Sequence, residues 1–284
     1  MPNARHLDAT DLAALLPAAE AVPLLQAALA ADDGGFAWAA DAAAATGGRA
    51  PAGTAALLRG GAPELLLDAA AFAARRDAAT VMLVARHLAD PQLEVITLLG
   101  CNATGRAVME LAVKAFPGLE RMLCYDPDVG RQAAFADEVM TTLSVASIIP
   151  PEPREATEGA QLLVSCLQPA PGKPVIEPEW LQAGTTCVLL DGTSTFTPAT
   201  LAAAARRVTD SLPAWRAAAA AGRLPGVPEP EGDLAALSAG RLPARVGQPI
   251  IVFVHLGAPE LDAALAAQLL ARSQAAGRGR QVAL

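Results

Sequence analysis

Short apolar runs dominate the chain from residue 94 onward. Each run has roughly four to seven residues, the length of a buried strand, and the stretches between runs have helical spacing or are short connections. Unbroken apolar strands separated by helices are typical of a parallel sheet that is covered on both faces. The pattern therefore predicts a doubly wound α/β domain. Its strands are predicted at residues 95–99, 122–125, 143–149, 162–167, 187–190, 207–210 and 250–255.

The remaining segments predict a smaller α+β part. Residues 7–31 have the pattern of an Ala- and Leu-rich helix that stops at Asp32-Asp33-Gly34-Gly35. A second helix ends before Asp90-Pro91, because the residue before a proline is disfavoured in a helix. That helix is predicted at 69–89. Short strands are predicted at 55–58 and 65–67, a Gly- and Pro-rich connection at 222–249, a final helix at about 260–276 and a frayed tail at 277–284.

Composition narrows the class of protein. The 284 residues are 53% hydrophobic and 18% charged, which is too apolar for a disordered chain and enough for one large domain or two smaller ones. The formal net charge is −8, and Lys114 and Lys173 are the two lysines. Because phosphate binding needs clustered basic residues, we expect neither a nucleic acid nor an anionic membrane as partner.

The cellular location is predicted from the cysteines and from the lack of apolar membrane or signal segments. No charge-free apolar run approaches the roughly 20 residues of a transmembrane helix, and no signal-peptide segment opens the sequence. The four cysteines are widely spaced and lie in or beside apolar runs, so we expect reduced, buried thiols in a cytoplasmic protein. The three histidines share no ligand spacing with them, so no metal site is expected.

Residues 94–116 hold the clearest local motif. A predicted strand runs directly into Gly100, a helix opens at Gly105, and the next strand ends at Asp126, 26 residues after Gly100. In a dinucleotide-binding βαβ unit the helix N-terminus holds the pyrophosphate, and an acidic residue after the second strand binds the adenosine ribose. A turn of the same fold without a ligand has the same layout. The dinucleotide interpretation assigns the site to Gly100, Cys101, Asn102, Ala103, Thr104, Gly105 and Asp126.

The motif departs from G-x-G-x-x-G at its middle glycine, where Asn102 stands. That glycine lets the backbone approach the pyrophosphate closely. Asparagine tolerates a left-handed backbone better than most residues, but its side chain occupies space. Asp126 is followed by Pro127 and Asp128 rather than by an arginine. Since a carboxylate repels a 2′-phosphate, this predicts NAD(H) in preference to NADP(H).

Two further segments flank the glycine loop in a fixed order. Residues 67–79 read LDAAAFAARRDAA, similar to a helix start written LDG-x-x-LT-x-x-RTAA. Residues 232–234 read GDL and residues 250–257 read IIVFVHLG, similar to GDL … ITVFKSVG. Together with the glycine loop, these segments resemble the ornithine cyclodeaminase/mu-crystallin family. The resemblance extends over residues 7–31 and 64–276.

The resemblance implies a fold and an activity. It implies a Rossmann domain at 91–253 and a dimerisation and substrate domain that combines 1–90 with 254–284. Members of the family move a hydride between the nicotinamide and an amine-bearing carbon. We therefore expect a homodimeric NAD(H)-dependent imine or ketimine reductase, or an amino-acid dehydrogenase, that acts on a small imino or amino acid. Two alternatives stay open: an ammonia-eliminating cyclodeaminase with recycled NAD, and a non-catalytic family scaffold or binding module.

The resemblance also assigns candidate catalytic residues. Arg76 stands where the family has its substrate-carboxylate arginine, while Asp77 replaces a threonine that faces the cofactor phosphates. Ser194 takes the position of the cyclodeaminase aspartate, which weakens the cyclodeaminase alternative. His255 replaces a serine at the nicotinamide end, where an imidazole can exchange a proton near neutral pH. A histidine that ends a buried strand and bonds to backbone is an equally acceptable interpretation.

The remaining assignments concern the cofactor and the last helix. Cys166 and Leu167 take the position at which the family's chain passes the nicotinamide ribose. Gly192, in the turn after the strand at 187–190, completes the expected cofactor residues. Asp262 resembles an aspartate at the start of the family's last helix, where it either caps the helix or contacts the ligand.

Overall fold

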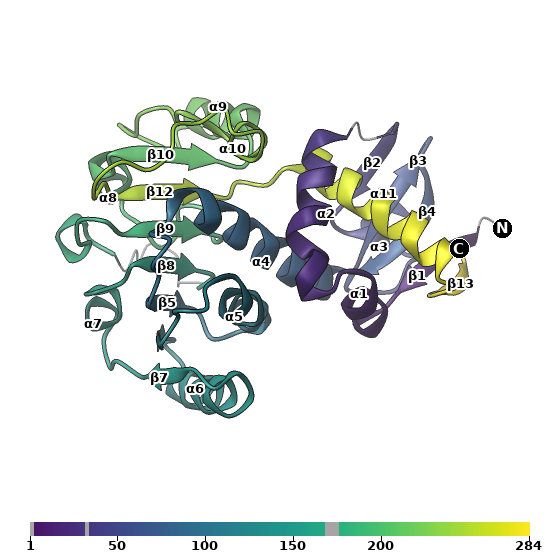
Figure 1. Ribbon diagram of the computed structural model, residues 1–284. Coiled ribbons are helices and arrows are strands. Elements are labelled where there is room, and N and C mark those ends of the chain that lie inside the picture. The colour runs from purple at the N-terminus through teal and green to yellow at the C-terminus, as the bar shows by residue number, and fades with distance from the viewer. Residues whose placement is uncertain (1–2, 32–33, 168–175) are drawn as a thin grey trace. The chain divides into compact units, whose positions relative to one another are not determined.

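The computed structural model describes residues 3–31, 34–167 and 176–284. The chain divides into two compact units, Met1–Ala79 with Ala258–Leu284, and Thr80–Gly257 (Figure 1). The domain boundaries predicted from the sequence are 90/91 and 253/254. The structural division instead falls inside helix α4 (Ala69–Leu88), which therefore contributes residues to both units.

An all-parallel sheet forms the centre of the second unit. Among the described residues, eight strands take the order β11-β10-β12-β9-β8-β5-β6-β7, and every neighbouring pair is parallel. This confirms the predicted doubly wound α/β fold. The strands are β5 (Val95–Leu99), β6 (Arg121–Tyr125), β7 (Ala146–Ile148), β8 (Leu162–Ser165), β9 (Thr186–Leu189), β10 (Arg206–Thr209), β11 (Gly232–Asp233) and β12 (Ile251–Val254).

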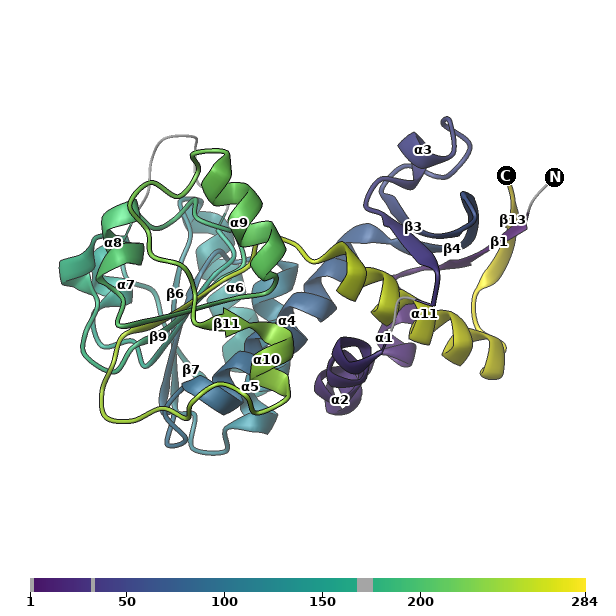
Figure 2. The same ribbon diagram turned by 90° about the horizontal axis from the view of Figure 1, so that it is seen from above.

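Helices lie on both faces of this sheet (Figure 2). One face packs its apolar side chains against Ala156, Leu201 and Trp215, which come from three different helices. Besides the end of α4, the described part of the unit contains the helices α5 (Ala103–Ala115), α6 (Val129–Leu143), α7 (Pro153–Thr157), α8 (Pro198–Ala203), α9 (Leu212–Ala220) and α10 (Leu234–Ser238), with a short 3₁₀ turn at Pro178–Trp180. Burial on both faces explains why the strands are continuous apolar runs.

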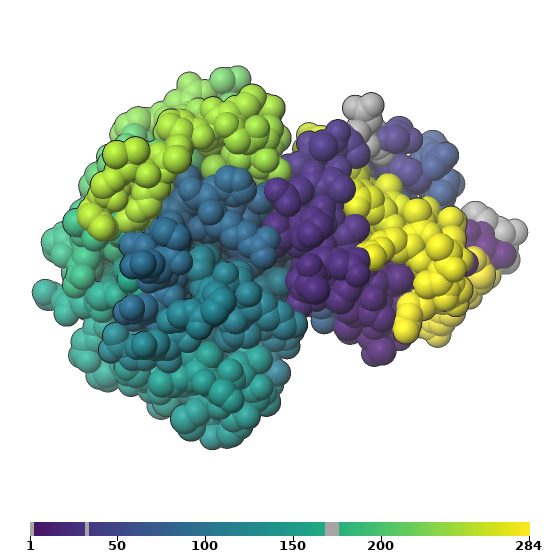
Figure 3. Space-filling view, in the orientation of Figure 1, coloured from purple at the N-terminus to yellow at the C-terminus, as the bar shows by residue number. Residues whose placement is uncertain are grey.

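The first unit is built on a mixed sheet. Five strands of the described chain take the order β13-β1-β4-β3-β2. Figure 3 shows the C-terminal helix lying against the N-terminal helices, where Arg272 Nη1 donates to the carbonyl of Leu15 at 2.7 Å. The elements are β1 (Asn3–Leu7), α1 (Ala9–Leu15), α2 (Ala18–Ala30), β2 (Phe36–Ala39), α3 (Ala42–Ala45), β3 (Thr54–Arg59), β4 (Ala62–Asp68), α11 (Pro259–Ala275) and β13 (Arg280–Ala283).

The predicted helix at 7–31 is wrong as a single element. The chain leaves the helix at Leu16, which has φ −126°, and Pro17 caps α2. A proline pushes the preceding residue out of the helical region, so Pro17 divides the segment. In the part of the chain that the structure describes, no single helix has the length and apolar character to cross a bilayer. The pair α1 and α2 passes that test on length and composition alone, bent by 80°.

Three other segments differ from the expectation. The tail at 277–284 is ordered, because β13 pairs antiparallel with β1. The predicted connection at 222–249 contains β11 and α10. The predicted strand at 143–149 shortens to β7, because α6 extends to Leu143 and Ser144 turns the chain in a left-handed conformation with φ 59°.

Candidate functional site

The carboxyl ends of β5 and β8 mark the point at which the sheet reverses its direction of growth. From β5 the chain adds β6 and β7 on one side and then returns to place β8 on the other. Ligands of open α/β sheets bind at such a point, outside the carboxyl ends of the strands. Gly100 follows β5 and Cys166 follows β8, so two of the predicted cofactor segments meet here.

Close packing requires glycine at both ends of the loop. Gly100 has φ +106°, and a Cβ there would lie 2.7 Å from the carbonyl carbon and oxygen of Cys166. A Cβ on Gly105 would lie 2.9 Å from the carbonyl oxygen of Gly100. These are the tight turn and the close helix–strand approach that the first and third glycines provide in a dinucleotide loop. The loop therefore fits a dinucleotide at both glycine positions.

Asn102 caps the helix that follows the loop. Its backbone is extended, with φ −138°, so the residue needs no left-handed conformation. Its Oδ1 accepts the amides of Thr104 and Gly105 at 3.0 and 3.1 Å, and its Nδ2 donates to the carbonyl of Cys166 at 2.9 Å. The side chain thus occupies amides at the N-terminus of α5, the groups that bind phosphate in this fold.

Asp126 is buried and fully engaged at the tip of β6, with 4% of its surface exposed. It accepts the Cys101 and Asp128 amides, both at 2.9 Å, and pairs with Arg131 Nη2 at 2.8 Å. Burial raises the pKa of Asp126, but the hydrogen bonds from Arg131, Cys101 and Asp128 outweigh it, so the net pKa is lowered. Sequence reasoning missed Arg131, which follows five residues later in the first turn of α6.

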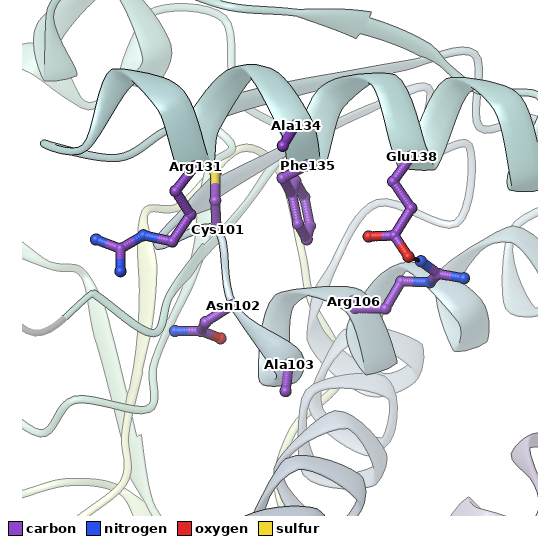
Figure 4. Close-up of a pocket in the computed structure, with 8 residues that line it drawn as sticks. All are labelled: Cys101, Asn102, Ala103, Arg106, Arg131, Ala134, Phe135 and Glu138. Carbon is purple, nitrogen blue, oxygen red and sulfur yellow. Dashed lines mark ion pairs between the residues drawn. The ribbon is translucent and has the colours of Figure 1, made fainter.

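A pocket of about 380 Å³ opens beside the loop. Figure 4 shows Cys101, Asn102 and Ala103 on the loop side and Arg131 and Glu138 on α6. An ion pair between Arg106 and Glu138 joins the two helices. The pocket therefore combines loop backbone with basic side chains, one of which already neutralises Asp126.

The four cysteines are free and buried, as predicted. The thiol of Cys166 donates to the carbonyl of Gly100 at 3.2 Å and so helps to fix the loop. A hydrogen bond with Cys124 and burial both raise the pKa of the Cys101 thiol. The raised pKa disfavours the thiolate form of Cys101 that a nucleophile needs.

His255 forms an ion pair beyond the end of β12. Its Nδ1 lies 2.8 Å from Asp210 Oδ2, and Asp210 follows the neighbouring strand β10. Burial raises the pKa of Asp210. The contact with His255 and the hydrogen bonds from the amides of Leu256 and Gly257 lower this pKa by more than burial raises it, so the net pKa is lowered. The imidazole therefore faces an ionised carboxylate. The sequence analysis names His255 but gives Asp210 no role.

The turn after β9 holds a second buried carboxyl. Asp191 accepts the hydroxyl of Ser165 at 2.6 Å and also that of Thr195. Burial raises the pKa of Asp191 to about 6, despite the two hydroxyl donors. Ser194 is exposed in the same turn, and its amide donates to the carbonyl of Asp191. Asp191, rather than Ser194, is the ionisable group of this turn.

Gly192 and Leu167 complete the predicted cofactor residues. Gly192 takes φ +69°, and a Cβ there would lie 3.6 Å from the carbonyl oxygen of His255. Leu167 is buried directly after Cys166. The turns after β8, β9 and β12 therefore carry Leu167, Gly192 and His255, all at the carboxyl edge of the sheet.

Arg76 lies in the first unit and is held by two carboxylates. Its Nε and Nη2 donate to Asp77 Oδ1 at 2.9 and 2.7 Å, and its Nη1 donates to both oxygens of Asp262 at 2.8 and 2.9 Å. Asp262 is not a helix cap, because α11 is capped at Ala258. The guanidinium is buried with more negative than positive charge around it.

Within the described ranges, no group of three or more His, Cys, Asp or Glu side chains is arranged to hold a metal ion.

Comparisons with known proteins find relatives of this chain in sequence and in fold. The model of the ornithine cyclodeaminase/mu-crystallin family matches residues 54–275. The chain is also 27% identical over 123 residues to N-((2S)-2-amino-2-carboxyethyl)-L-glutamate dehydrogenase of Staphylococcus aureus. That match covers 43% of this chain and 36% of the enzyme, so it spans about a third of the relative's length.

Solved structures share the whole fold at low identity. Thermococcus litoralis Δ1-pyrroline-2-carboxylate reductase, in complex with NADH and L-proline, has a TM-score of 0.78 at 18% identity and covers 98% of this chain and 100% of its own. An archaeal alanine dehydrogenase dimer with bound NAD has a TM-score of 0.78 at 18% identity, with 100% of both chains covered. The two likenesses show that both units of the fold are shared.

Proposed function

Because the chain belongs to the ornithine cyclodeaminase/mu-crystallin family, we propose that it is an NAD(H)-dependent imine or ketimine reductase, or an amino-acid dehydrogenase, acting on a small imino or amino acid. The solved relatives with NADH and L-proline and with NAD support this proposal. So does the relative from Staphylococcus aureus, which is named as a dehydrogenase of a substituted L-glutamate.

The observation that carries the proposal is the fit of the glycine loop. Gly100 and Gly105 sit where a side chain would collide with backbone, and the loop ends at the N-terminus of α5. When bound, a nicotinamide cofactor supplies or accepts the hydride. We assign its binding to the loop residues Gly100, Cys101, Asn102, Ala103, Thr104 and Gly105, with Asp126, Cys166, Leu167 and Gly192 from the neighbouring turns.

His255 is our proposed proton donor and acceptor. It lies at the carboxyl edge of the sheet, beside the turn that holds Gly192. Imidazole exchanges protons near neutral pH, which suits an imine that must gain a proton as it is reduced. Ser194 is exposed in the turn after β9, and we propose that its hydroxyl contacts the substrate.

Arg76 is our proposed anchor for a substrate carboxylate. A guanidinium binds carboxylate in a bidentate way. The ion pairs with Asp77 and Asp262 mean that a substrate must exchange with one of them. We expect Asp77, which stands where the family has threonine, to be the partner that leaves. Asp77→Thr should then lower KM for a carboxylate-bearing imine.

We further propose a preference for NAD(H). The buried carboxylate of Asp126 supports it, and the exposed, basic Arg131 opposes it. Asp126→Asn tests the balance, because it removes the charge that neutralises Arg131 and retains one side-chain oxygen, which can accept either the Cys101 or the Asp128 amide. We expect the ratio of Kd values for NADPH and NADH to fall about tenfold. An unchanged ratio would contradict a role for Asp126 in cofactor choice.

The first experiment is a fluorescence titration of the protein with NADH and, separately, with NADPH. Micromolar binding of NADH is expected, followed by NADH consumption with cyclic imines or with 2-oxo acids plus an amine. Tighter binding of NADPH would overturn the cofactor preference. Binding of neither would overturn the oxidoreductase proposal and favour a non-catalytic family scaffold.

Asp191 favours a second candidate function, the elimination of ammonia with recycled NAD. A carboxyl with a pKa raised to about 6 can exchange protons near neutral pH, and it lies in the turn after β9. Stoichiometry separates the two functions. A cyclodeaminase releases one ammonia per turnover without net change in NADH absorbance, whereas a reductase consumes NADH.

We also propose a cytoplasmic homodimer. The four buried, free thiols suit a reducing compartment. The alanine dehydrogenase of similar fold is a dimer. Light scattering of the purified protein tests the dimer, with twice the 28.9 kDa chain mass as the expected result.

A further inference from the structure

Asp210 and His255 meet because two neighbouring strands end together. Strands β10 and β12 are parallel and in register, with Arg206 opposite Ile251 and Thr209 opposite Val254. The next residue on each strand is therefore Asp210 and His255, and their side chains meet at 2.8 Å. The register of the two strands therefore brings these side chains together.

The carboxylate is held more firmly than the imidazole. Asp210 is buried, with 1% of its side chain exposed against 15% for His255. Its oxygens accept the amide of Leu256 at 3.0 and 3.1 Å and that of Gly257 at 2.7 Å, and the Thr209 hydroxyl lies 3.2 Å from Oδ1. With these donors in place the carboxylate keeps its position, and the imidazole must align with it.

An ionised carboxylate at Nδ1 selects one form of the ring. It requires a proton on Nδ1, so that Nε2 becomes the nitrogen that exchanges a proton. It also favours the positively charged imidazolium over the neutral ring. A histidine in this state can hold a proton until an imine requires it, and can take one back in the reverse direction.

We propose that Asp210 is a positioning residue, which fixes the tautomer and orientation of His255 so that Nε2 passes a proton to or from the reacting imine nitrogen. This inference rests on the function proposed above. In the reducing direction the C=N bond gains a hydride at carbon from the cofactor and a proton at nitrogen from the imidazolium, which leaves neutral imidazole. The reverse direction returns both.

A further ionisable group, Asp191, lies near this pair. Strand β9 flanks β12 on the side opposite β10, and the turn after it carries Asp191. Its carboxyl bonds to the hydroxyls of Ser165 and Thr195, so it belongs to a separate hydrogen-bond group. An effect of Asp191 on the pH profile is distinguished by the variant Asp191→Asn, which leaves the Asp210 contact in place.

The test uses the three histidines of the chain, which make ¹⁵N-histidine NMR assignable by single substitutions. In the wild type we expect His255 to carry its proton on Nδ1 when neutral. In Asp210→Asn we expect its titration midpoint to fall by about one pH unit. The pH at which kcat declines should move down by the same amount, kcat itself should fall roughly tenfold, and Kd for NADH should stay unchanged.

Controls separate positioning from folding. Thr209→Val removes a hydroxyl beside Asp210 Oδ1 but leaves the Nδ1 contact, and should leave the His255 midpoint unchanged. If Asp210→Asn does not fold, His255→Gln tests the same step, because the pH limb of kcat should disappear with Kd for NADH retained. A persisting limb would overturn the inference.

The outcomes also separate this inference from the proposed function. If NADH binds and imines are reduced, but Asp210→Asn changes neither the midpoint nor the pH limb, then the positioning role is wrong and the function stands. If neither NADH nor NADPH binds, the function fails, and a shifted midpoint would report an ion pair that positions no proton donor. Either result overturns the proposal.

Discussion

At the scale of single residues, we expect Asn102 to limit how strongly the glycine loop binds a phosphate. Its side-chain oxygen Oδ1 accepts hydrogen bonds from the amides of Thr104 and Gly105, which lie at the positive end of α5. Asn102→Gly removes that competitor, and glycine at a helix cap costs only a few tenths of a kcal/mol. We expect Kd for NADH to fall about tenfold, equal to about 1.4 kcal/mol.

Asn102→Asp is the matched control for that substitution. It retains the capping oxygen and adds a negative charge beside the proposed pyrophosphate site, so NADH binding should weaken. It also loses the Nδ2 donor to the Cys166 carbonyl, so thermal stability should fall. Calorimetric titration with NADH measures both variants. If Asn102→Gly binds NADH more weakly than the wild type, then the asparagine itself contributes to cofactor binding and the competition argument is wrong.

Asp191 makes stability depend on pH in an unusual direction. Its pKa is raised to about 6 in the folded chain, so the folded state binds the proton more tightly than the unfolded state. The cost of ionising it is absent below its unfolded pKa, about 3.9, and complete above pH 6. Asp191→Asn should therefore stabilise the protein at pH 8 by on the order of 3 kcal/mol and by little at pH 4.

The test is thermal unfolding of the wild type and of Asp191→Asn at pH 4, 6 and 8. The difference in Tm between the two proteins should grow as the pH rises from 4 to above 6. Ser165→Ala serves as the control, because it removes a hydroxyl donor to Asp191 and should push the window to higher pH. A Tm difference that is the same at all three values would contradict the buried, raised carboxyl.

These residues show where sequence reasoning stops. The glycine positions and Asp126 were identified from spacing along one βαβ unit, where local order sets three-dimensional order. The partners Arg131 and Asp210 were not, because a side chain five residues along a helix and a carboxylate on a neighbouring strand meet only in the folded chain. The sequence analysis singles out Arg76, Asp77 and Asp262, but the ion pairs among them were not predicted, and Asp262 is 186 residues from Arg76.

At the scale of elements, the C-terminal strand closes the smaller sheet. Residues Asn3 to His6 of β1 pair with β13, and Leu284 is buried in a cluster with Ala4 and Leu66. Deletion of residues 277–284 exposes an edge of β1 and removes an apolar side chain that contributes about 1.5–3 kcal/mol. We expect Tm to fall by at least about 5 °C and the amides of β1 to lose protection from hydrogen exchange.

Leu284→Ala is the milder control for the deletion. It keeps the strand pairing and removes most of the apolar contact, so it should lower Tm less and leave β1 protected. If the deletion leaves both Tm and β1 exchange unchanged, the tail behaves as the frayed end that its Gly- and Arg-rich sequence suggests. Strand β13 could not be predicted from the sequence. Three of its four residues have polar or small side chains, and they do not form an alternating apolar pattern.

The apolar runs that are buried on both faces were located to within a few residues, because burial leaves a continuous signal. The edge strand β11 gave no such signal. β11 has two residues, and its partner β10 lies on one side only. Pro17 likewise shows that one residue can divide a helix whose periodicity is otherwise continuous.

At the scale of the whole molecule, the proposed cofactor residues all belong to one of the two compact units, Thr80–Gly257, whereas Arg76 belongs to the other. NADH should therefore stabilise the two units unequally.

At a free NADH concentration of a hundred times Kd, binding contributes about 2.7 kcal/mol to the stability of the unit that holds the cofactor. We expect calorimetry to show the transition of that unit rising by roughly 5–10 °C. Hydrogen exchange should show new protection in α5 and in the turn after β8, with little change in β1 to β4. Equal protection of both units would mean that they unfold as one cooperative body, and no protection at millimolar NADH would remove the basis for an oxidoreductase.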